Sequence, residues 1–381
     1  MEVLNLEIPD VMIDDYLQVR GNRTLPDKIQ KDCERVAHAE ADIGMLQIGY
    51  RGLDFEKIRK GQEMGCRIFA QPDEALERNI HQALKYEKGI SPLYTEFPVD
   101  LSGWWKQQIP KESWPVWPVP SGDKKLRIIQ MLYHANDGDS EHELQNLTPE
   151  VFAIEPTWHQ LNMEIGCEIA WVGEIVEEMS AIGHGFVPDL YTRSMKQAKH
   201  LIAFNGANLG YGKDPYVEGD VVNGVHVDFN HRTFLTPANT DGFDSGFRSW
   251  NHRWQKIKAT GVKKNRLITQ TGLWKMIVSG GVFRANLHEV ICTADILKWA
   301  HVRLAHNCNA VRGTYAVWLH ADPETPMGVI PEIANDARFQ KQVLKFEHDP
   351  LMLPQDIYTR FKNYYEYFLW QLDEIFRASE K

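Results

Sequence analysis

The sequence predicts an α+β protein, in which a helical front precedes a barrel or sandwich of strands and one helix closes the chain. Apolar residues recur at helical spacing in the first half, short apolar runs alternate with turn residues after about residue 198, and an amphipathic segment ends the chain. With 381 residues, 43% of them hydrophobic and 25% charged, the chain can bury a large core. We expect one unit of two regions: a helical region, 1–197, that braces the β-rich core, 198–381.

Composition excludes several classes of partner. The formal net charge is −10, which argues against a nucleic-acid partner because such binding rests on clustered Lys and Arg. The five cysteines are odd in number and form no CxxC, so neither a disulfide scaffold nor a zinc ribbon is expected. The first residues do not resemble a signal peptide, and no apolar run is long enough to span a bilayer. We therefore expect a cytoplasmic protein without a membrane partner; the sequence gives no indication of its oligomeric state.

Four elements are predicted early in the chain. Apolar residues at helical spacing indicate helices over 26–41 and 52–65, and the short apolar, β-tolerant segment 43–50 indicates a strand between them. A further helix is expected over 73–88, where proline precedes the segment and glycine follows it.

The longest predicted helix runs from Thr148 to Ile182. Pro149 falls at the first helical position, where its missing N–H costs nothing, and Gly183 follows the last apolar position. The apolar residues between them recur at helical spacing, so we expect a helix of the protein core.

The β-rich core is predicted from short apolar runs separated by turn residues, which suggests a double-sheet barrel. The runs are HLIAFNG, GVHVDFN, RTFLTPAN, RLITQTG, WKMIVSGG, HEVICT and GTYAVWLH. Gly280 and Gly281 are expected to form a tight turn between two strands, the second of which carries His288. The final helix is expected over Pro354 to Phe376.

The residues with the clearest chemical meaning lie in GVHVDFN. On a strand, residues two apart share a face, so His226 and Asp228 would converge on one point. Two imidazoles and one carboxylate on one side of a metal, with the other side open, are typical of iron(II) sites that activate dioxygen. His288 is the best third ligand because strand-like residues flank it, and His231 is the runner-up.

A second pair of residues extends this site. Arg312 and Thr314 also have strand spacing, and a guanidinium with a hydroxyl on one face is well suited to hold a carboxylate. In an iron site, this would be the distal carboxylate of a 2-oxoacid co-substrate whose other end chelates the metal. Alone, Arg312 would more often form an ion pair with an acidic neighbour.

The ordered set HxD, MIVSGGVFRANLHEV and Arg-x-Thr resembles the iron(II)/2-oxoglutarate-dependent dioxygenases, in the branch similar to isopenicillin N synthase. Thr314 stands where that branch usually has serine, and the gap from His288 to Arg312 is longer than in many plant members. Asn205 is a partial counterpart of the family's Asn-x-Tyr segment, which helps to hold the oxoacid.

The resemblance implies a double-stranded β-helix (jelly-roll) fold, with Fe(II), 2-oxoglutarate and O2 as the reacting groups. It implies that decarboxylation of oxoglutarate to succinate drives oxidation of a C–H bond in a small molecule. Hydroxylation, desaturation and oxidative cyclisation all fit, and an amino-acid-derived compound of secondary metabolism is the expected type of substrate.

Other readings stay open. An iron oxidase or cyclase independent of oxoglutarate would use Arg312 and Thr314 to hold a carboxylate of its substrate, and a jelly-roll binding protein would lack catalysis altogether. Arg248, His252 and Arg253 lie between the predicted ligand strands and are candidates for contact with an acidic substrate. Solvated loop arginines and a packed histidine are the more common roles for such residues.

Overall fold

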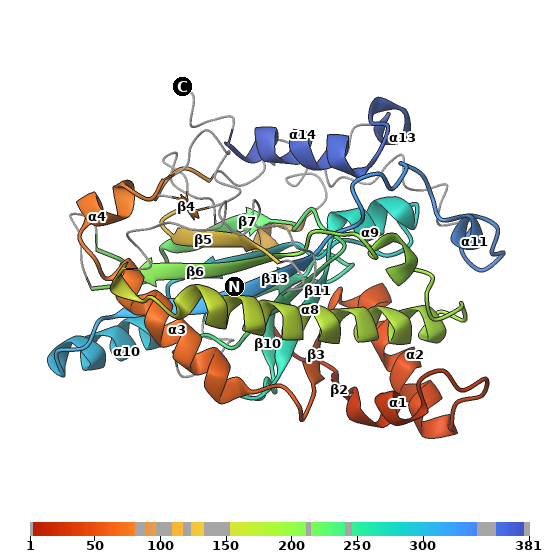
Figure 1. Cartoon of the computed structure of the whole chain (residues 1–381), viewed down its shortest axis with the longest axis horizontal. Coiled ribbons are helices and arrows are strands. Elements are labelled where there is room, and N and C mark those ends of the chain that lie inside the picture. The colour runs from red at the N-terminus through yellow and green to blue at the C-terminus, as the bar shows by residue number, and fades with distance from the viewer. Residues whose placement is uncertain are drawn as a thin grey trace.

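Two β-sheets form the centre of the protein, and helices pack outside them (Figure 1). The structure is a computed structural model. It describes residues 3–80, 89–91, 93–96, 109–116, 123–132, 153–210, 215–240, 246–340 and 356–376.

The smaller sheet has five strands, and its neighbours are antiparallel except for the parallel pair at one edge. In spatial order the strands are β1 (Leu4–Glu7), β10 (Lys256–Thr260), β9 (Phe247–Trp250), β12 (His288–Ile291) and β7 (Val221–His226).

The larger sheet has eight strands and is also antiparallel except at one edge, where β2 and β3 run parallel. In spatial order the strands are β2 (Asp10–Met12), β3 (Met45–Gly49), β11 (Leu267–Thr271), β8 (Arg232–Leu235), β13 (Val311–Leu319), β6 (Leu201–Asn208), β5 (Leu126–Met131) and β4 (Gly89–Ser91).

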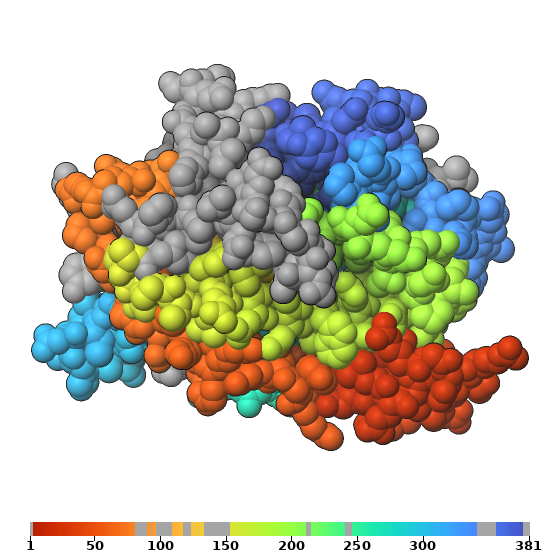
Figure 2. Space-filling view, viewed as in Figure 1, coloured from red at the N-terminus to blue at the C-terminus, as the bar shows by residue number. Residues whose placement is uncertain are grey.

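Four helices from the first half of the chain gather on one side of the molecule, where α2 and α3 pack against α8 and all three of these helices pack against the larger sheet. They are α1 (Asp14–Val19), α2 (Asp27–Asp42), α3 (Phe55–Phe69) and α8 (Trp158–Gly183). Figure 2 shows α8 (yellow-green) and the orange and red N-terminal helices together on this face of the molecule. Their apolar sides bury the main core, and Gly65 of α3 lies so close to Phe204 that an added Cβ would be 2.4 Å from its ring. Small residues let the helix approach the sheet this closely.

The predicted strand at 43–50 and the helices at 26–41 and 52–65 are confirmed. The region before residue 198 is less helical than expected, because it also contains four strands that the sequence did not predict: β1, β2, β4 and β5. Together with β3 they join the same two sheets as the later strands. Strands this short carry little periodicity, and pairing with distant strands, not local pattern, fixes them.

Two predicted helices are shorter in the structure. Helix α8 begins at Trp158, because Pro156 has no N–H to donate and disfavours helical backbone at the residue before it; the predicted start at Thr148 lies outside the described residues. The helix expected over 73–88 is α4, Asp73–Glu77, and residues 81–88 lie outside the described part.

The segment WKMIVSGG is a helix, α9 (Leu273–Val278), and not the predicted strand. All six of its residues are buried, so no polar face marks its period, and a short apolar run cannot be told from a strand by pattern alone. Gly280 and Gly281 follow this helix with positive φ angles of 64° and 82° and end it, instead of forming a hairpin turn.

The C-terminal helix is interrupted. Helices α13 (Ile357–Arg360) and α14 (Tyr364–Phe376) are separated near Asn363, which forms an isolated β-bridge with Pro326. Both pack on α9, with the Tyr364 and Trp274 rings 4.6 Å apart. A further helix, α10 (Ala294–Ala305), lies between β12 and β13, and short elements complete the described set: α11 (Pro331–Ala334) and the 3-10 turns at Lys111–Ser113 and Thr192–Ser194. Among the described residues, no helix has the length and apolar character required to cross a membrane.

His184, the residue after α8, gives a test of this packing. Its ring lies 4.1 Å from that of Phe283, and burial lowers the pKa of His184 to about 4. An unfolded histidine has a pKa of about 6.5, so the neutral ring stabilises the fold fully above that pH, and this contribution is lost as the pH falls toward 4. Between pH 7 and pH 5, the free energy of unfolding should therefore fall by about 2 kcal/mol more in the wild-type protein than in the His184→Phe variant. Urea denaturation at both pH values measures this, and equal losses would contradict it.

Candidate metal centre

His226 and His288 come together because their strands pair. They are directly opposed residues on the antiparallel strands β7 and β12, which places both side chains on one face of the sheet. Their ring centroids are 4.1 Å apart. The pairing therefore brings two imidazoles together from positions far apart in the sequence.

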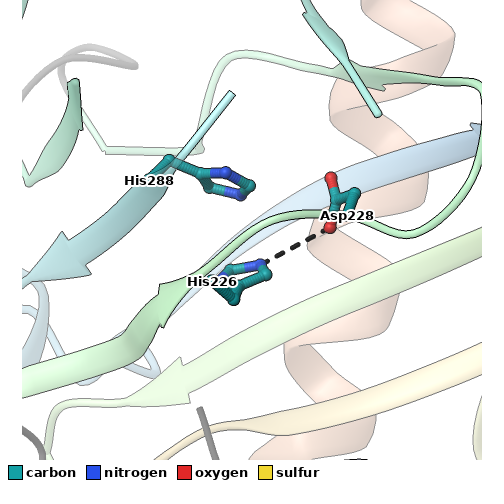
Figure 3. Close-up of side chains that lie close together, drawn as sticks. All are labelled: His226, Asp228 and His288. Carbon is teal, nitrogen blue, oxygen red and sulfur yellow. Dashed lines mark ion pairs between the residues drawn. The ribbon is translucent and has the colours of Figure 1, made fainter. Parts of the chain in front are cut away.

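Asp228 completes the group from beyond the strand. Strand β7 ends at His226, so the prediction that the strand itself carries both residues is wrong. Pairing with β12 stops at His288, and the chain then turns so that the Asp228 carboxylate lies 3.5 Å from His226 Nε2. One potential ligand atom from each of the three residues lies within 4.8 Å of the others, and Figure 3 shows the three side chains pointing toward one another.

Hydrogen bonds behind the three side chains fix their orientation. His226 Nδ1 lies 2.7 Å from the carbonyl of Gly224, and His288 Nδ1 lies 3.1 Å from the carbonyl of Asn286. Each contact leaves Nε2 free to face the centre of the group, which is the arrangement that metal-binding histidines use. The hydroxyl of Thr233 donates to Asp228 Oδ2 at 2.6 Å and leaves Oδ1 toward His226.

The electrostatics favour the protonation states that bind metal. Burial raises the pKa of Asp228, but the hydrogen bond with His226 and the nearby His288 and Thr233 outweigh it and hold the pKa well below its usual value. Burial and the neighbouring His226 lower the pKa of His288 to about 4. Near neutral pH the group therefore offers an ionised carboxylate and a neutral His288.

A cavity lies beside these residues, between the two sheets. The empty space between the lining residues amounts to about 510 Å³, which includes open solvent. Its polar lining consists of Lys125, Asn205, Asn223, His288, Arg312 and Thr314, and its apolar lining includes Val222, Leu235, Phe247 and Val290. No acidic residue is among the described residues that line it. The cavity is therefore suited to an anion that reaches from His288 toward the arginine.

Arg312 is a buried cation without an acidic partner in the part of the chain that the structure describes. Only 5% of the residue is exposed, and its Nε has no hydrogen-bond acceptor among the described residues. Burial lowers the pKa of Arg312 to about 10, which still leaves it charged at neutral pH. Because an uncompensated buried charge is costly, the guanidinium is poised to receive an anion from outside the chain.

Thr314 and Asn205 lie beside Arg312 and are directly opposed on β13 and β6. The Thr314 hydroxyl donates to the carbonyl of Thr236 at 2.8 Å, so it can bind an anion only by redirecting its proton. Asn205 Oδ1 accepts from Arg127 Nε at 2.6 Å, and this leaves its amide NH2 as a possible donor.

Lys125 is a cavity residue that sequence reasoning missed. Its ammonium donates to Asp123, to Asn223 and to Glu96, at 2.7, 2.6 and 2.9 Å, so all three protons have protein acceptors. In the sequence, Lys125 is one of two adjacent lysines that resemble a solvated strand end, and no pattern separates this buried lysine from an exposed one. Thr233 and Asn286 were missed for the same reason: their roles depend on contacts made by folding.

The remaining sequence candidates do not line the cavity. His231 Nε2 lies 3.2 Å from Glu177, on the helix side of the larger sheet, and it is not part of the three-residue group. Arg248 donates to the carbonyl of Phe247, and His252 is half-buried in a turn where its backbone carbonyl accepts from Arg284. Arg253 lies in the same turn, with its backbone N–H bonded to Asn251.

Removing the Thr233 hydroxyl tests the orientation of Asp228. We expect Thr233→Val to weaken binding of Co(II), a spectroscopic substitute for Fe(II), by about tenfold, because outer hydrogen bonds of this kind tune ligand geometry. Absorbance titration of purified protein measures the effect. Thr271→Val is the matched control, since the buried Thr271 hydroxyl has no partner in the described structure. An unchanged affinity in Thr233→Val would show that the hydroxyl is dispensable for metal binding.

Comparison with known proteins finds solved structures that have a similar fold. No protein-family model matches the sequence, and no curated protein matches it either. Among solved structures, a Caulobacter crescentus protein assigned to the 2OG-Fe(II) oxygenase family is similar, with a TM-score of 0.66, 14% identity and coverage of 97% of this chain and 99% of that one. A full-length Neurospora crassa protein in complex with alpha-KG has a TM-score of 0.62 at 13% identity, covering 96% and 95% of the two chains. JOX2 in complex with 2OG, Fe and JA has a TM-score of 0.58 at 16% identity, covering 87% and 80%. The chain thus shares the fold of these solved structures over nearly its whole length.

Proposed function

We propose that the protein is an Fe(II)- and 2-oxoglutarate-dependent oxygenase. The observation that carries the proposal is the buried cation Arg312, without an acidic partner among the described residues, in the same cavity as His288 of the His226–Asp228–His288 group. A metal site alone would fit many reactions. A metal site joined by one cavity to a carboxylate-binding cation fits a co-substrate that has a chelating end and a distal carboxylate.

The residues fit the implied groups. Two imidazoles and one carboxylate, brought together on one side, are the ligand set of mononuclear non-haem Fe(II) oxygenases. Arg312 would bind the distal carboxylate of oxoglutarate, with Thr314 and Asn205 as additional donors. When bound, iron and oxoglutarate would supply the redox chemistry, in which O2 is the oxidant and takes two electrons from oxoglutarate and two from the C–H bond of the substrate. The chain's own part is to hold Asp228 ionised, orient the imidazoles and offer the Arg312 guanidinium to the distal carboxylate.

The finer expectations belong to the same proposal. We infer a double-stranded β-helix core and a place near the isopenicillin N synthase-like branch from the order of the motifs. We also propose a small-molecule substrate, since the Neurospora crassa protein has been solved with alpha-KG and thymine and JOX2 with 2OG, Fe and JA. Whether the outcome is hydroxylation, desaturation or oxidative cyclisation depends on how the substrate is held, and an amino-acid-derived compound remains the proposed type.

The oxoglutarate part of the proposal is tested by Arg312→Met. Anaerobic wild-type protein with Fe(II) and oxoglutarate should develop a visible charge-transfer band. Loss of a charged hydrogen-bond donor should raise the Kd for oxoglutarate by about tenfold to 100-fold without loss of iron. Arg248→Met, which removes a guanidinium outside the cavity, should bind oxoglutarate like wild type. If iron binds but no band forms in wild type, the oxoglutarate proposal fails and Arg312 is left to hold a carboxylate of the substrate.

Catalysis is tested by His226→Ala. We expect this variant to lose bound Fe(II) and all oxoglutarate-dependent formation of succinate, because an incomplete ligand set cannot hold the metal at the cavity. His306→Ala, at an exposed histidine, should form succinate at the wild-type rate. Succinate formation that survives in His226→Ala would exclude this site as the catalytic one, and product formed without succinate would indicate an oxoglutarate-independent oxidase.

A further inference from the structure

Four charged residues form a closed cluster on the helix side of the larger sheet, away from the cavity. They are Glu40 of α2, Glu177 of α8, Arg232 of β8 and Lys275 of α9, and all four side chains are completely buried. Arg232 pairs with both carboxylates, and Lys275 reaches them at 3.0 Å (Glu40) and 2.7 Å (Glu177). We call these four residues the buried quartet. Its two positive and two negative charges balance.

The quartet is joined to Asp228 by two separate routes. Arg232 is followed directly by Thr233, whose hydroxyl donates to Asp228 Oδ2 at 2.6 Å. Lys275 lies two residues after Leu273, whose backbone N–H donates to the Asp228 carbonyl at 2.7 Å. The two residues that donate hydrogen bonds to Asp228, Thr233 and Leu273, therefore each lie within two sequence positions of one cation of the quartet.

Helix α9 also holds the rest of the segment that carries Asp228. The N–H of Trp274 donates to the carbonyl of Asn230, and the N–H of Gly272 donates to the carbonyl of His231, both at 3.0 Å. The His231 ring contacts Glu177 at 3.2 Å. A displacement of α9 or of the start of β8 would thus move the whole segment 228–231.

We propose that the buried quartet positions the metal ligand Asp228. Asp228 lies beyond the end of β7, so the strand pairing that places the two histidines does not place it. The quartet supplies the missing constraint by fixing β8 and α9 against α2 and α8. Buried ion pairs often add little stability compared with apolar residues of the same size, so a role in geometry accounts for their presence here better than a role in stability. The proposal rests on the proposed metal site and assigns its positioning residues.

The experiment compares Co(II) binding by full-length variants without oxoglutarate. Lys275→Met combined with Glu40→Gln removes one charge of each sign, so the remaining pair stays balanced. Val176→Ala is the matched control: Val176 is buried in α8 next to Glu177, packs in the apolar core and should cost stability only. Urea denaturation records the stability of each protein, and visible absorbance records both the Kd for Co(II) and the ligand-field spectrum.

We expect the double variant to bind Co(II) about tenfold more weakly than wild type with an altered spectrum, as for other changes behind metal ligands, and Val176→Ala to keep the wild-type Kd and spectrum. A folded double variant with wild-type affinity and spectrum would overturn the proposal and leave the proposed oxygenase function intact.

If the double variant does not fold, Ser180→Ala replaces it. The Ser180 hydroxyl donates to Glu40 at 2.8 Å and accepts from Lys275 at 2.9 Å, so its loss loosens the quartet mildly. We expect about threefold weaker Co(II) binding, and an unchanged Kd overturns the proposal. Failure of wild-type protein to bind Co(II) through His226 would overturn the quartet's role and the proposed function together.

Discussion

The antiparallel pairing of β7 with β12 is the contact on which the site depends. It sets His226 opposite His288 and brings the two strands to an end at the place where Asp228 enters. A shift of one residue in this register would turn one imidazole to the other face of the sheet and abolish the group. The helices, the second sheet and the cavity can contribute to the candidate site only if this register is formed, because the register brings the two imidazoles together.

Two kinds of buried charge occur in the protein, and they have opposite consequences. In the buried quartet, each cation faces two carboxylates, and the ammonium of Lys275 has three acceptors. At Arg312, the guanidinium is also deeply buried but faces no carboxylate among the described residues. A satisfied cluster makes its surroundings rigid, whereas an unsatisfied cation creates affinity for a ligand. The same chemistry thus accounts for the proposed positioning of Asp228 on one side and for the proposed binding of an anion on the other.

The sequence predicted the three residues His226, Asp228 and His288 of the candidate metal centre, but not the structural elements that bring them together. The HxD spacing identified His226 and Asp228, yet Asp228 reaches the group from an irregular segment and not from the strand. His288 was selected through a supposed hairpin at Gly280 and Gly281, although those glycines end a helix. Local pattern reports which residue types are present, but strand ends and a helix buried on all sides are decided by distant partners. Lys125 and Thr233 could not have been found, because only folding gives them their neighbours.

The first strands of the chain carry a consequence for its synthesis. Strand β1 closes one edge of the smaller sheet and β2 closes one edge of the larger, each as a parallel neighbour. Leu4 lies opposite Ile257, so β1 pairs with a segment that is synthesised much later than itself. Until β10 has been made, β1 remains an unsatisfied edge that other chains could pair with. The smaller sheet, and with it the meeting of His226 and His288, can therefore be completed only after β12 has been made, when α2, α3 and α8 are already available to fold against.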